Sequence, residues 1–265
     1  MAAAQYVQKH RLAQTIERGL TEALKSQPDN PYEALAAFFK DVPAAPAADD
    51  DHDREGAYSL DTPAAHVEYY DKWASTYDSD FAEQEGYSYP ENLSAHYLSI
   101  AEPGDTPVAD IGAGTGLAGI GFKDSETEVD ALDISPGMLK QAAAKGVYRS
   151  TVVADLTDAK ALPNKALYGG LISSGTFTFG HLGPDELETS LLLARPNALC
   201  VIGVNALHYE KEGFSKKMAA LEAAGCISKP EIVTVPIYAT PTPQQVASAG
   251  KDANLLCFRL LKPPT

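Results

Sequence analysis

Cysteine, cationic side chains and long apolar runs are all scarce in this sequence of 265 residues. The only three cysteines, Cys200, Cys226 and Cys257, show no CxxC spacing, which argues against a disulfide framework or a zinc site and fits a reducing compartment. The 21 lysines and arginines are outnumbered by 36 acids, and the net charge of −15 makes nucleic acid an unfavourable partner. The longest apolar run, Ala198 to Val204, has seven residues, far fewer than the ~18 that would span a membrane.

Signals for export are also missing from the N-terminus. Residues Met1–Tyr6 form neither the charged nor the apolar region of a signal peptide, so a cytoplasmic protein is expected. At roughly 150 residues per domain, the length allows one α/β domain with a small appendage.

Residues 1–42 predict a helical hairpin. Apolar residues between Leu12 and Leu24 recur at helical spacing, and a second stripe runs from Tyr32 to Phe39. Asn30 is placed to cap the second helix, with Pro31 at its first position. Two short helices cannot bury both stripes between themselves, so a partner surface is expected, either the main domain or a second copy of the chain.

Residues 43–62 predict a linker. The stretch from Asp41 to Thr62 contains seven acids and one arginine, and it includes the Pro- and Ala-rich run Pro43–Ala48. Such a segment buries too little apolar surface to fold by itself, and charge repulsion should keep it extended.

Residues 63–265 predict an α/β domain, because strand-like runs alternate with helical stretches. Helical stretches between the first five strands favour a parallel sheet, whereas the weakly helical link Ala239–Gly250 leaves room for an antiparallel last strand. The expected strands are Val108–Ile111, Glu128–Ile134, Ser150–Ala154, Gly169–Ser174, Ala198–Asn205, Glu231–Tyr238 and Asn254–Leu261.

A glycine-rich turn, Gly112–Gly116, follows the first strand of this domain. Glycines let the backbone approach a ligand closely, and the N-terminus of the following helix offers free N–H groups. The spacing to Gly119, with Asp133 19 residues after Gly114, also fits a dinucleotide fingerprint. A nicotinamide-dependent oxidoreductase therefore stays an alternative.

Acidic residues at three successive strand ends favour a different ligand. Asp110 stands just before the glycine turn, where a carboxylate favours an ammonium group over a pyrophosphate. Asp133 and Asp155 close the second and third strands. Three such acids fit a positively charged adenosyl ligand.

These motifs resemble a known class of enzymes. Asp110–Gly116, Ala131–Leu139 and Ala154–Leu156 look like the first three motifs of class I S-adenosylmethionine-dependent methyltransferases. Tyr70–Asp78 and Ser135–Tyr148 are similar to the methyltransferase-like family named after the Williams–Beuren region and its bacterial relatives.

The resemblance implies a Rossmann-like fold whose seven-stranded, mostly parallel sheet has an antiparallel last strand. It implies S-adenosylmethionine as the cofactor, S-adenosylhomocysteine as the product, and no metal. In this reading the glycines line the methionine part, Asp133 binds the ribose, and the residues after the second and third strands surround the adenine. The implied cofactor-binding residues are Tyr70, Trp73, Tyr77, Asp110, Gly112, Ala113, Gly114, Gly116, Leu117, Asp133, Ile134, Met138, Asp155, Leu156, Ser173 and Ser174.

Aromatic residues gather just before the first strand. Six of the 13 tyrosines and the only tryptophan fall between residues 69 and 97. Aromatic faces stabilise cations such as a sulfonium by ~0.5–2 kcal/mol each, so this cluster is expected to cover the cofactor.

The acceptor is expected to be a small molecule with an O, N or S nucleophile. The fourth strand lacks the Asp/Asn-Pro-Pro-aromatic loop of enzymes that methylate amide or base nitrogens, and it leads to His181, a candidate general base. The candidate catalytic residues are His181 and Tyr209. The candidate acceptor-binding residues are Tyr77, Tyr87, Tyr89, His181, Asn205, His208 and Tyr209. The other histidines, His10, His52, His66 and His96, form no constellation and are expected to be exposed to solvent.

The N-terminal hairpin has a resemblance of its own. Residues 6–39, with the run Asn30-Pro-Tyr-Glu-Ala-Leu-Ala36, look like the docking-and-dimerisation helices of protein kinase A regulatory subunits and of the small COMPASS dimerisation subunit. This implies a homodimer whose open face could dock an amphipathic helix. A docked scaffold protein with a vestigial methyltransferase body is therefore a further alternative.

Overall fold

The computed structural model describes residues 16, 20, 28, 30–41, 57, 60, 62–163, 165–243, 245–246 and 250–264. The chain divides into two compact units, Met1–Asp51 and His52–Thr265, and each is described by itself. Most of the first predicted helix and most of the predicted linker lie outside the described residues.

The longest described part of the first unit is helix α3 (Pro31–Asp41). The predicted cap is confirmed, because Asn30 Oδ1 accepts hydrogen bonds from the backbone N–H groups of Tyr32 (3.1 Å) and Glu33 (3.3 Å). Tyr32 is 82% exposed and Phe39 42% exposed within the described structure. Both ends of the apolar stripe of α3 are thus exposed, whereas Leu35 between them is partly buried.

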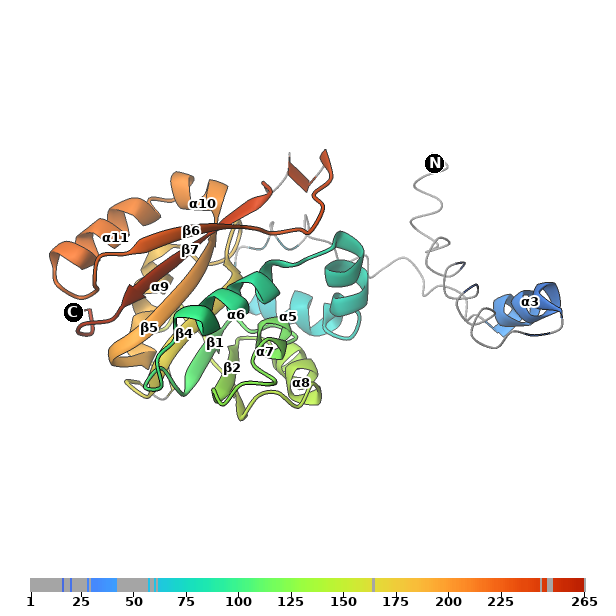
Figure 1. Cartoon of the computed structure of the whole chain (residues 1–265), viewed down its shortest axis with the longest axis horizontal. Helices are drawn as coiled ribbons and strands as arrows, with labels where there is room; N and C mark the ends of the chain where they lie inside the picture. Colours follow the sequence, from blue (N-terminus) through green and yellow to red (C-terminus); the bar gives the residue numbers. More distant parts are fainter. Residues whose placement is uncertain are drawn as a thin grey trace. The chain divides into compact units, whose positions relative to one another are not determined.

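The second unit is built on a seven-stranded sheet of order β3-β2-β1-β4-β5-β7-β6 (Figure 1). Strand β7 is antiparallel to both β5 and β6, and the other pairings are parallel. The predicted α/β fold with an antiparallel last strand is confirmed. The strands are β1 (Val108–Ile111), β2 (Val129–Asp133), β3 (Ser150–Val153), β4 (Tyr168–Phe177), β5 (Ala194–Asn205), β6 (Glu231–Pro236) and β7 (Asp252–Arg259).

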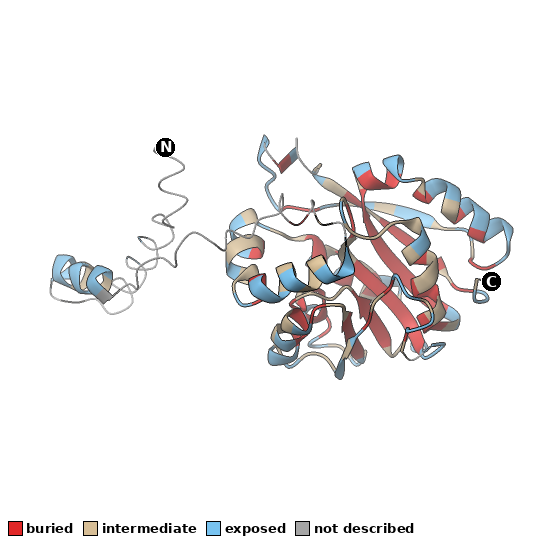
Figure 2. Cartoon of the chain, turned by 180° about the vertical axis from the view of Figure 1, so that it is seen from behind, coloured by how far each residue is buried: buried red, intermediate tan, exposed pale blue. Residues whose placement is uncertain are grey.

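Helices cover both faces of this sheet, and the burial of the central strands shows why (Figure 2). Alternate residues of β5 enter different cores: Cys200 and Ile202 pack on one face, Leu199 and Val201 on the other. Successive side chains of a strand point to opposite faces of the sheet, so a strand that is apolar at every position must be covered on both faces. The helical segments are α5 (Pro63–Trp73), the π-helix η1 (Asp78–Glu83), α6 (Tyr89–Ile100), α7 (Leu117–Ile120), α8 (Pro136–Ala144), α9 (Pro184–Ser190), the 3₁₀ turn η2 (Leu191–Leu193), α10 (Ala206–Lys211) and α11 (Phe214–Ala223).

The two cores separate the helices into two layers. Leu187 of α9 and Phe214 of α11 belong to the core on one face, whereas Leu93 of α6 and Ala118 of α7 belong to the core on the other. Across the described helices, none combines the length and apolarity that a membrane span needs.

Candidate active site

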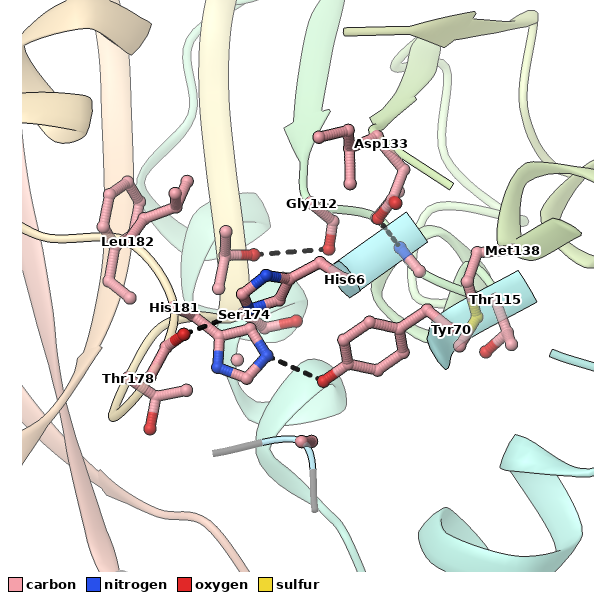
Figure 3. Close-up of a pocket in the computed structure, with 18 of the residues that line it drawn as sticks. His66, Tyr70, Gly112, Thr115, Asp133, Met138, Ser174, Thr178, His181 and Leu182 are labelled. Carbon is pink, nitrogen blue, oxygen red and sulfur yellow. Dashed lines mark hydrogen bonds between the residues drawn. The ribbon is translucent and has the colours of Figure 1, made fainter. Parts of the chain in front are cut away.

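A cavity of about 530 Å³ lies where the carboxyl ends of β1 to β5 meet. In open α/β sheets this edge is where ligands bind, and the volume lies within the ~300–1,000 Å³ typical of small-molecule sites. The loops after these strands form one side, and α5 and η1 form the other (Figure 3).

The glycine turn after β1 is shaped by its neighbours. Gly112 has φ +63°, and a Cβ there would overlap the Thr176 side chain. Gly116 has φ +89°, and a Cβ there would meet the ring of Tyr148. The lack of a side chain at Gly116 thus leaves room for the Tyr148 ring beneath the turn. Gly116 itself does not line the cavity.

Asp133 joins the loops after β1 and β2 and also lines the cavity. Its Oδ2 accepts a hydrogen bond from Gly114 N and its Oδ1 accepts one from Ser135 N, both at 2.8 Å. Burial raises the pKa of this carboxyl, and the backbone hydrogen bonds oppose that shift. A carboxylate in this position can accept hydrogen bonds from a ribose diol, as the sequence predicts.

Asp110 differs from the prediction, because it does not line the cavity. It is 1% exposed, and its Oδ2 accepts a 2.6 Å hydrogen bond from the Tyr148 hydroxyl. Burial, with a smaller contribution from the charge of Asp133, raises the pKa of Asp110 to about 7, against the lowering effect of the Tyr148 hydrogen bond. The structure therefore holds Asp110 below the glycine turn.

Asp155, at the end of β3, does line the cavity together with Leu156. Its Oδ1 accepts hydrogen bonds from Thr157 N (2.8 Å) and Thr157 Oγ1 (2.7 Å). These hydrogen bonds within its own turn hold the Asp155 carboxylate in place. Ile134 and Met138 also line the cavity.

Aromatic rings form a continuous wall on the other side of the cavity. The ring centroids of Tyr70 and Trp73 are 6.0 Å apart, those of Trp73 and Tyr77 4.8 Å, and those of Tyr77 and Phe81 5.2 Å. Phe81 then meets Tyr87 at 5.1 Å. Five of the seven clustered aromatic residues of the sequence line the cavity, whereas Tyr69 and Tyr97 do not.

Two aspartates that the sequence analysis missed tie this wall to the loops. Asp71 Oδ1 accepts hydrogen bonds from Ser135 Oγ (2.6 Å) and Gly137 N (2.7 Å). Asp78 accepts hydrogen bonds from Thr115 Oγ1 and from Lys145 Nζ, both at 2.5 Å. The repeat of the Tyr-Asp pair at residues 70–71 and 77–78 was the available signal.

His181 lies between the end of β4 and α9 and lines the cavity. Its Nδ1 is 2.9 Å from Phe179 O, and its Nε2 is 2.7 Å from the Tyr70 hydroxyl (Figure 3). A carbonyl oxygen only accepts, so Nδ1 donates, and in the neutral ring Nε2 accepts from Tyr70. Burial, with the nearby His66 and His208, lowers the pKa of His181 to about 4, so the ring is neutral near pH 7.

His66 is a further residue that the sequence analysis missed, because it was expected to be exposed to solvent. It lines the cavity, and its ring centroid is 5.0 Å from that of His181 (Figure 3). Its ring nitrogens are 2.9 Å from Thr62 O and 3.0 Å from Gly180 O. The available signal was its position four residues before Tyr70, one helical turn away on α5.

Of the other three histidines that were expected to be exposed, only His96 lies within the described residues. His96 is only partly exposed and contacts Cys257 Sγ at 3.3 Å, while His10 and His52 lie outside the described residues. Ala57 and Leu60, which the sequence placed in the linker, contribute to the cavity lining.

His208 and Tyr209, which were expected to touch the acceptor, do not line the cavity. Asn205 lines it, and its Oδ1 caps α10 by accepting from Leu207 N (3.0 Å) and His208 N (3.2 Å). This cap starts the helix so that Tyr209 stacks on Phe214 in the core, with ring centroids 6.1 Å apart, and His208 packs between aromatic rings. Tyr209 therefore does not stand among the candidate catalytic groups of the cavity.

The remaining candidates divide clearly by position. Ser173 is fully buried and donates to Ile111 O at 2.8 Å, so it supports the sheet. Outside the lining lie Asp110, Gly116, Ser173, His208 and Tyr209. The cavity brings together Tyr70, Trp73, Tyr77, Tyr87, Tyr89, Gly112, Ala113, Gly114, Leu117, Asp133, Ile134, Met138, Asp155, Leu156, Ser174, His181 and Asn205.

Comparison with known proteins gives one curated relative and many solved structures. No protein-family model matches the chain. Over 177 residues the chain is 27% identical to human methyltransferase-like protein 27, which covers 64% of this chain and 71% of that protein.

Solved structures share the fold. Magnesium protoporphyrin IX methyltransferase from Synechocystis, solved with S-adenosylmethionine bound, matches with a TM-score of 0.55 and 16% identity, over 76% of this chain and 98% of that one. A Methanococcus maripaludis protein assigned as an S-adenosylmethionine-dependent methyltransferase matches with a TM-score of 0.51 and 15% identity, over 75% and 94%. The second unit therefore has the Rossmann-like fold of the class I S-adenosylmethionine-dependent methyltransferases.

Proposed function

We propose that this protein transfers a methyl group from S-adenosylmethionine to a small-molecule acceptor. The observation that carries the proposal is the convergence of the glycine turn, Asp133 and Asp155 on one cavity, opposite an aromatic wall. The likeness to human methyltransferase-like protein 27 supports the same class of reaction.

The residues of the cavity fit this cofactor. Asp133 would accept the ribose hydroxyls, Ile134 and Met138 would flank the adenine, and Asp155 with Leu156 would meet its amino edge. The faces of Tyr70, Trp73 and Tyr77 would stabilise the positive charge of the sulfonium. The carboxylates suit a ligand that carries positive charge better than the two phosphates of a dinucleotide.

When bound, S-adenosylmethionine supplies an already activated methyl group, so the protein mainly aligns donor and acceptor. Holding two reactants in line and excluding water can supply ~7–11 kcal/mol of the barrier. The hydrogen bonds of Asp71 and Asp78 fix the aromatic wall against both cofactor loops, which keeps this alignment. We assign His181 the role of general base. Among the described residues, no three His, Cys, Asp or Glu side chains are grouped as a metal site would require.

Calorimetry tests the cofactor directly. S-adenosylmethionine and S-adenosylhomocysteine are expected to bind the full chain, whereas NAD and NADP are expected not to, because the described residues that line the cavity include no lysine or arginine to offset the two charges of a pyrophosphate. Binding of a dinucleotide instead would replace this proposal with the oxidoreductase alternative. Cofactor binding without turnover of any acceptor in a screen of acids, amines, thioethers and phenols would favour the docked scaffold.

We further propose that residues 1–42 form a dimerisation hairpin, that residues 43–62 form a tether whose last part, with Ala57 and Leu60, packs on the cavity, and that residues 63–265 form the methyltransferase domain. The exposed apolar side chains Tyr32 and Phe39 of α3 favour a partner for this hairpin. Burying a large apolar side chain stabilises an interface by roughly 1.5–3 kcal/mol. This gain outweighs the free-energy cost of association only when the apolar stripes of several helices pack against one another.

Light scattering distinguishes the arrangements. The full chain is expected to be a dimer, and a chain that starts at His52, where the second compact unit begins, is expected to be a monomer. A monomeric full chain would refute the dimer. A dimer that survives the truncation would move the interface to the methyltransferase domain.

A further inference from the structure

The part of the cavity that the cofactor residues do not account for is mostly aromatic and aliphatic. Its walls include Phe81, Tyr87, Tyr89, Leu182, Ile237 and Tyr238. Tyr87 and Tyr238 stand 6.2 Å apart and Tyr87 and Tyr89 6.1 Å apart, measured between ring centroids. Aromatic side chains pack best against a planar apolar ring, so this half favours an aryl ligand.

The charge of the cavity disfavours an anionic ligand. Of the described residues that line it, none is a lysine or an arginine, while three are acids: Asp133, Asp155 and Glu186. The two nitrogens of His66 face the carbonyl oxygens of Thr62 and Gly180, so neither is directed at a ligand. A carboxylate or phosphate moved into this cavity would lose its hydration without gaining a lysine or arginine partner among these residues.

One pair of side chains is arranged to take up a proton. The Tyr70 hydroxyl donates to His181 Nε2 over 2.7 Å, and His181 Nδ1 donates to Phe179 O over 2.9 Å. The lone pair of His181 is therefore reached through Tyr70. A hydroxyl oxygen that donates one hydrogen bond can still accept one from a ligand.

We propose that the methyl acceptor is an uncharged aryl alcohol whose hydroxyl donates to Tyr70 Oη and whose proton passes through Tyr70 to His181 Nε2. This inference rests on the proposed methyltransferase function. A thioether or a tertiary amine has no proton to give up and would leave the Tyr70–His181 pair without a role, and a carboxylic acid would enter as an anion.

The atoms and charges of this step balance. The acceptor oxygen forms a bond to the methyl carbon as the carbon–sulfur bond breaks and its electron pair returns to sulfur. The acceptor proton moves to Tyr70 Oη while the Tyr70 proton moves to His181 Nε2. The products are the aryl methyl ether, S-adenosylhomocysteine and a protonated His181, so the positive charge passes from sulfur to the histidine.

A weakly basic histidine is sufficient for this step. An aryl hydroxyl becomes far more acidic while its oxygen forms a second bond to carbon, so the proton can leave late and to a weak base. The low pKa of about 4 that burial imposes on His181 keeps the ring ready to accept at neutral pH. It also favours the later release of that proton to water.

Binding of matched probes to the full chain tests the acceptor class. Naphthol, naphthylamine, naphthoate and naphthyl methyl sulfide, substituted at the same ring position, are titrated calorimetrically into protein saturated with S-adenosylhomocysteine. Naphthol is expected to bind at least ~10-fold more tightly than naphthoate, because a buried unpaired charge is costly. Equal or tighter binding of naphthoate, or no binding of naphthol, would overturn the inference. Failure of S-adenosylhomocysteine to bind would instead overturn the proposed function.

Turnover tests the proton path. With S-adenosylmethionine, naphthol is expected to give its methyl ether, and Tyr70→Phe is expected to lower kcat at least ~10-fold while the Kd of S-adenosylhomocysteine changes little. Tyr69→Phe is the matched control on the same helix, because Tyr69 does not line the cavity. The double variant Tyr70→Phe/His181→Gln is expected to be no slower than His181→Gln alone, because residues that act as one unit are not additive. Full activity of Tyr70→Phe, losses that multiply, or methylation of the sulfide in preference to naphthol would overturn the inference.

Discussion

Replacing His181 with glutamine is expected to lower kcat by ~10²–10⁴ and to leave cofactor affinity nearly unchanged. The histidine is the general base of the proposed reaction, and glutamine keeps a polar side chain of similar reach but cannot take up a proton. His181 is also fixed on both sides, by Phe179 O and by the Tyr70 hydroxyl, so its loss removes a positioned base and not a mobile one.

Steady-state kinetics at saturating cofactor, together with calorimetry of S-adenosylhomocysteine, check this expectation. A loss in affinity as large as the loss in kcat would contradict it. Nearly full activity would mean that the nucleophile reacts without a base, as a thioether or a tertiary amine does. In that case His181 would be a packing residue only.

The pH profile of kcat gives an independent readout. The titratable groups that face His181 are Tyr70 and His66 from α5 and His208 from α10. Because the pKa of His181 is lowered to about 4, its base form persists as the pH falls from 7 to roughly 5. For a histidine with the usual pKa of ~6.5, the rate would already decline in that range. A decline centred near the usual value would contradict the assignment of the base.

Replacing Asp133 with alanine is expected to weaken the binding of S-adenosylmethionine and S-adenosylhomocysteine by more than ~10-fold. The variant removes the carboxylate that faces the cavity, and hydrogen bonds to a charged acceptor contribute about 1.5–3 kcal/mol each. It also removes the partner of Gly114 N and Ser135 N, which frees the two loops that the carboxylate joins.

Calorimetry measures the affinity for the cofactor. Thermal unfolding shows whether loss of the two loop hydrogen bonds also destabilises the fold. Asp124→Ala is the control, because it removes the same charge from an exposed position. Asp133→Asn keeps one carbonyl acceptor and is expected to lose less affinity than Asp133→Ala. Unchanged cofactor binding in a folded Asp133→Ala variant would remove Asp133 from the cofactor site.

The sheet and the part of the site that lies on strand ends could be predicted from the amino-acid pattern alone. All seven predicted strands are present, because runs such as Leu199–Ile202 in β5 are apolar on both faces. The Asn30 cap was also predictable, since it depends only on the next three residues. Parallel strands end at one edge, so Gly112, Asp133 and Asp155 meet there once the sheet forms.

The direction of each polar side chain depends on packing between segments that are distant in the chain. Asp110 carries the acid expected of its motif, but it turns to a tyrosine 38 positions later in the chain, Tyr148, and leaves the cavity. His208 and Tyr209 follow a strand end as expected, but the cap made by Asn205 starts α10 so that both enter the core.

Contacts between distant segments explain the residues that were missed. His66 and Tyr70 reach the cavity only because α5 is held over it. The hydrogen bonds that hold this segment join Asp71 to Ser135 and Asp78 to Thr115. No local pattern encodes such pairs, because their energies arise between segments that are 37 to 64 residues apart. Strands, turns and caps follow from neighbouring residues, whereas the hydrogen-bonding partner of a buried polar group depends on which segments the fold brings together.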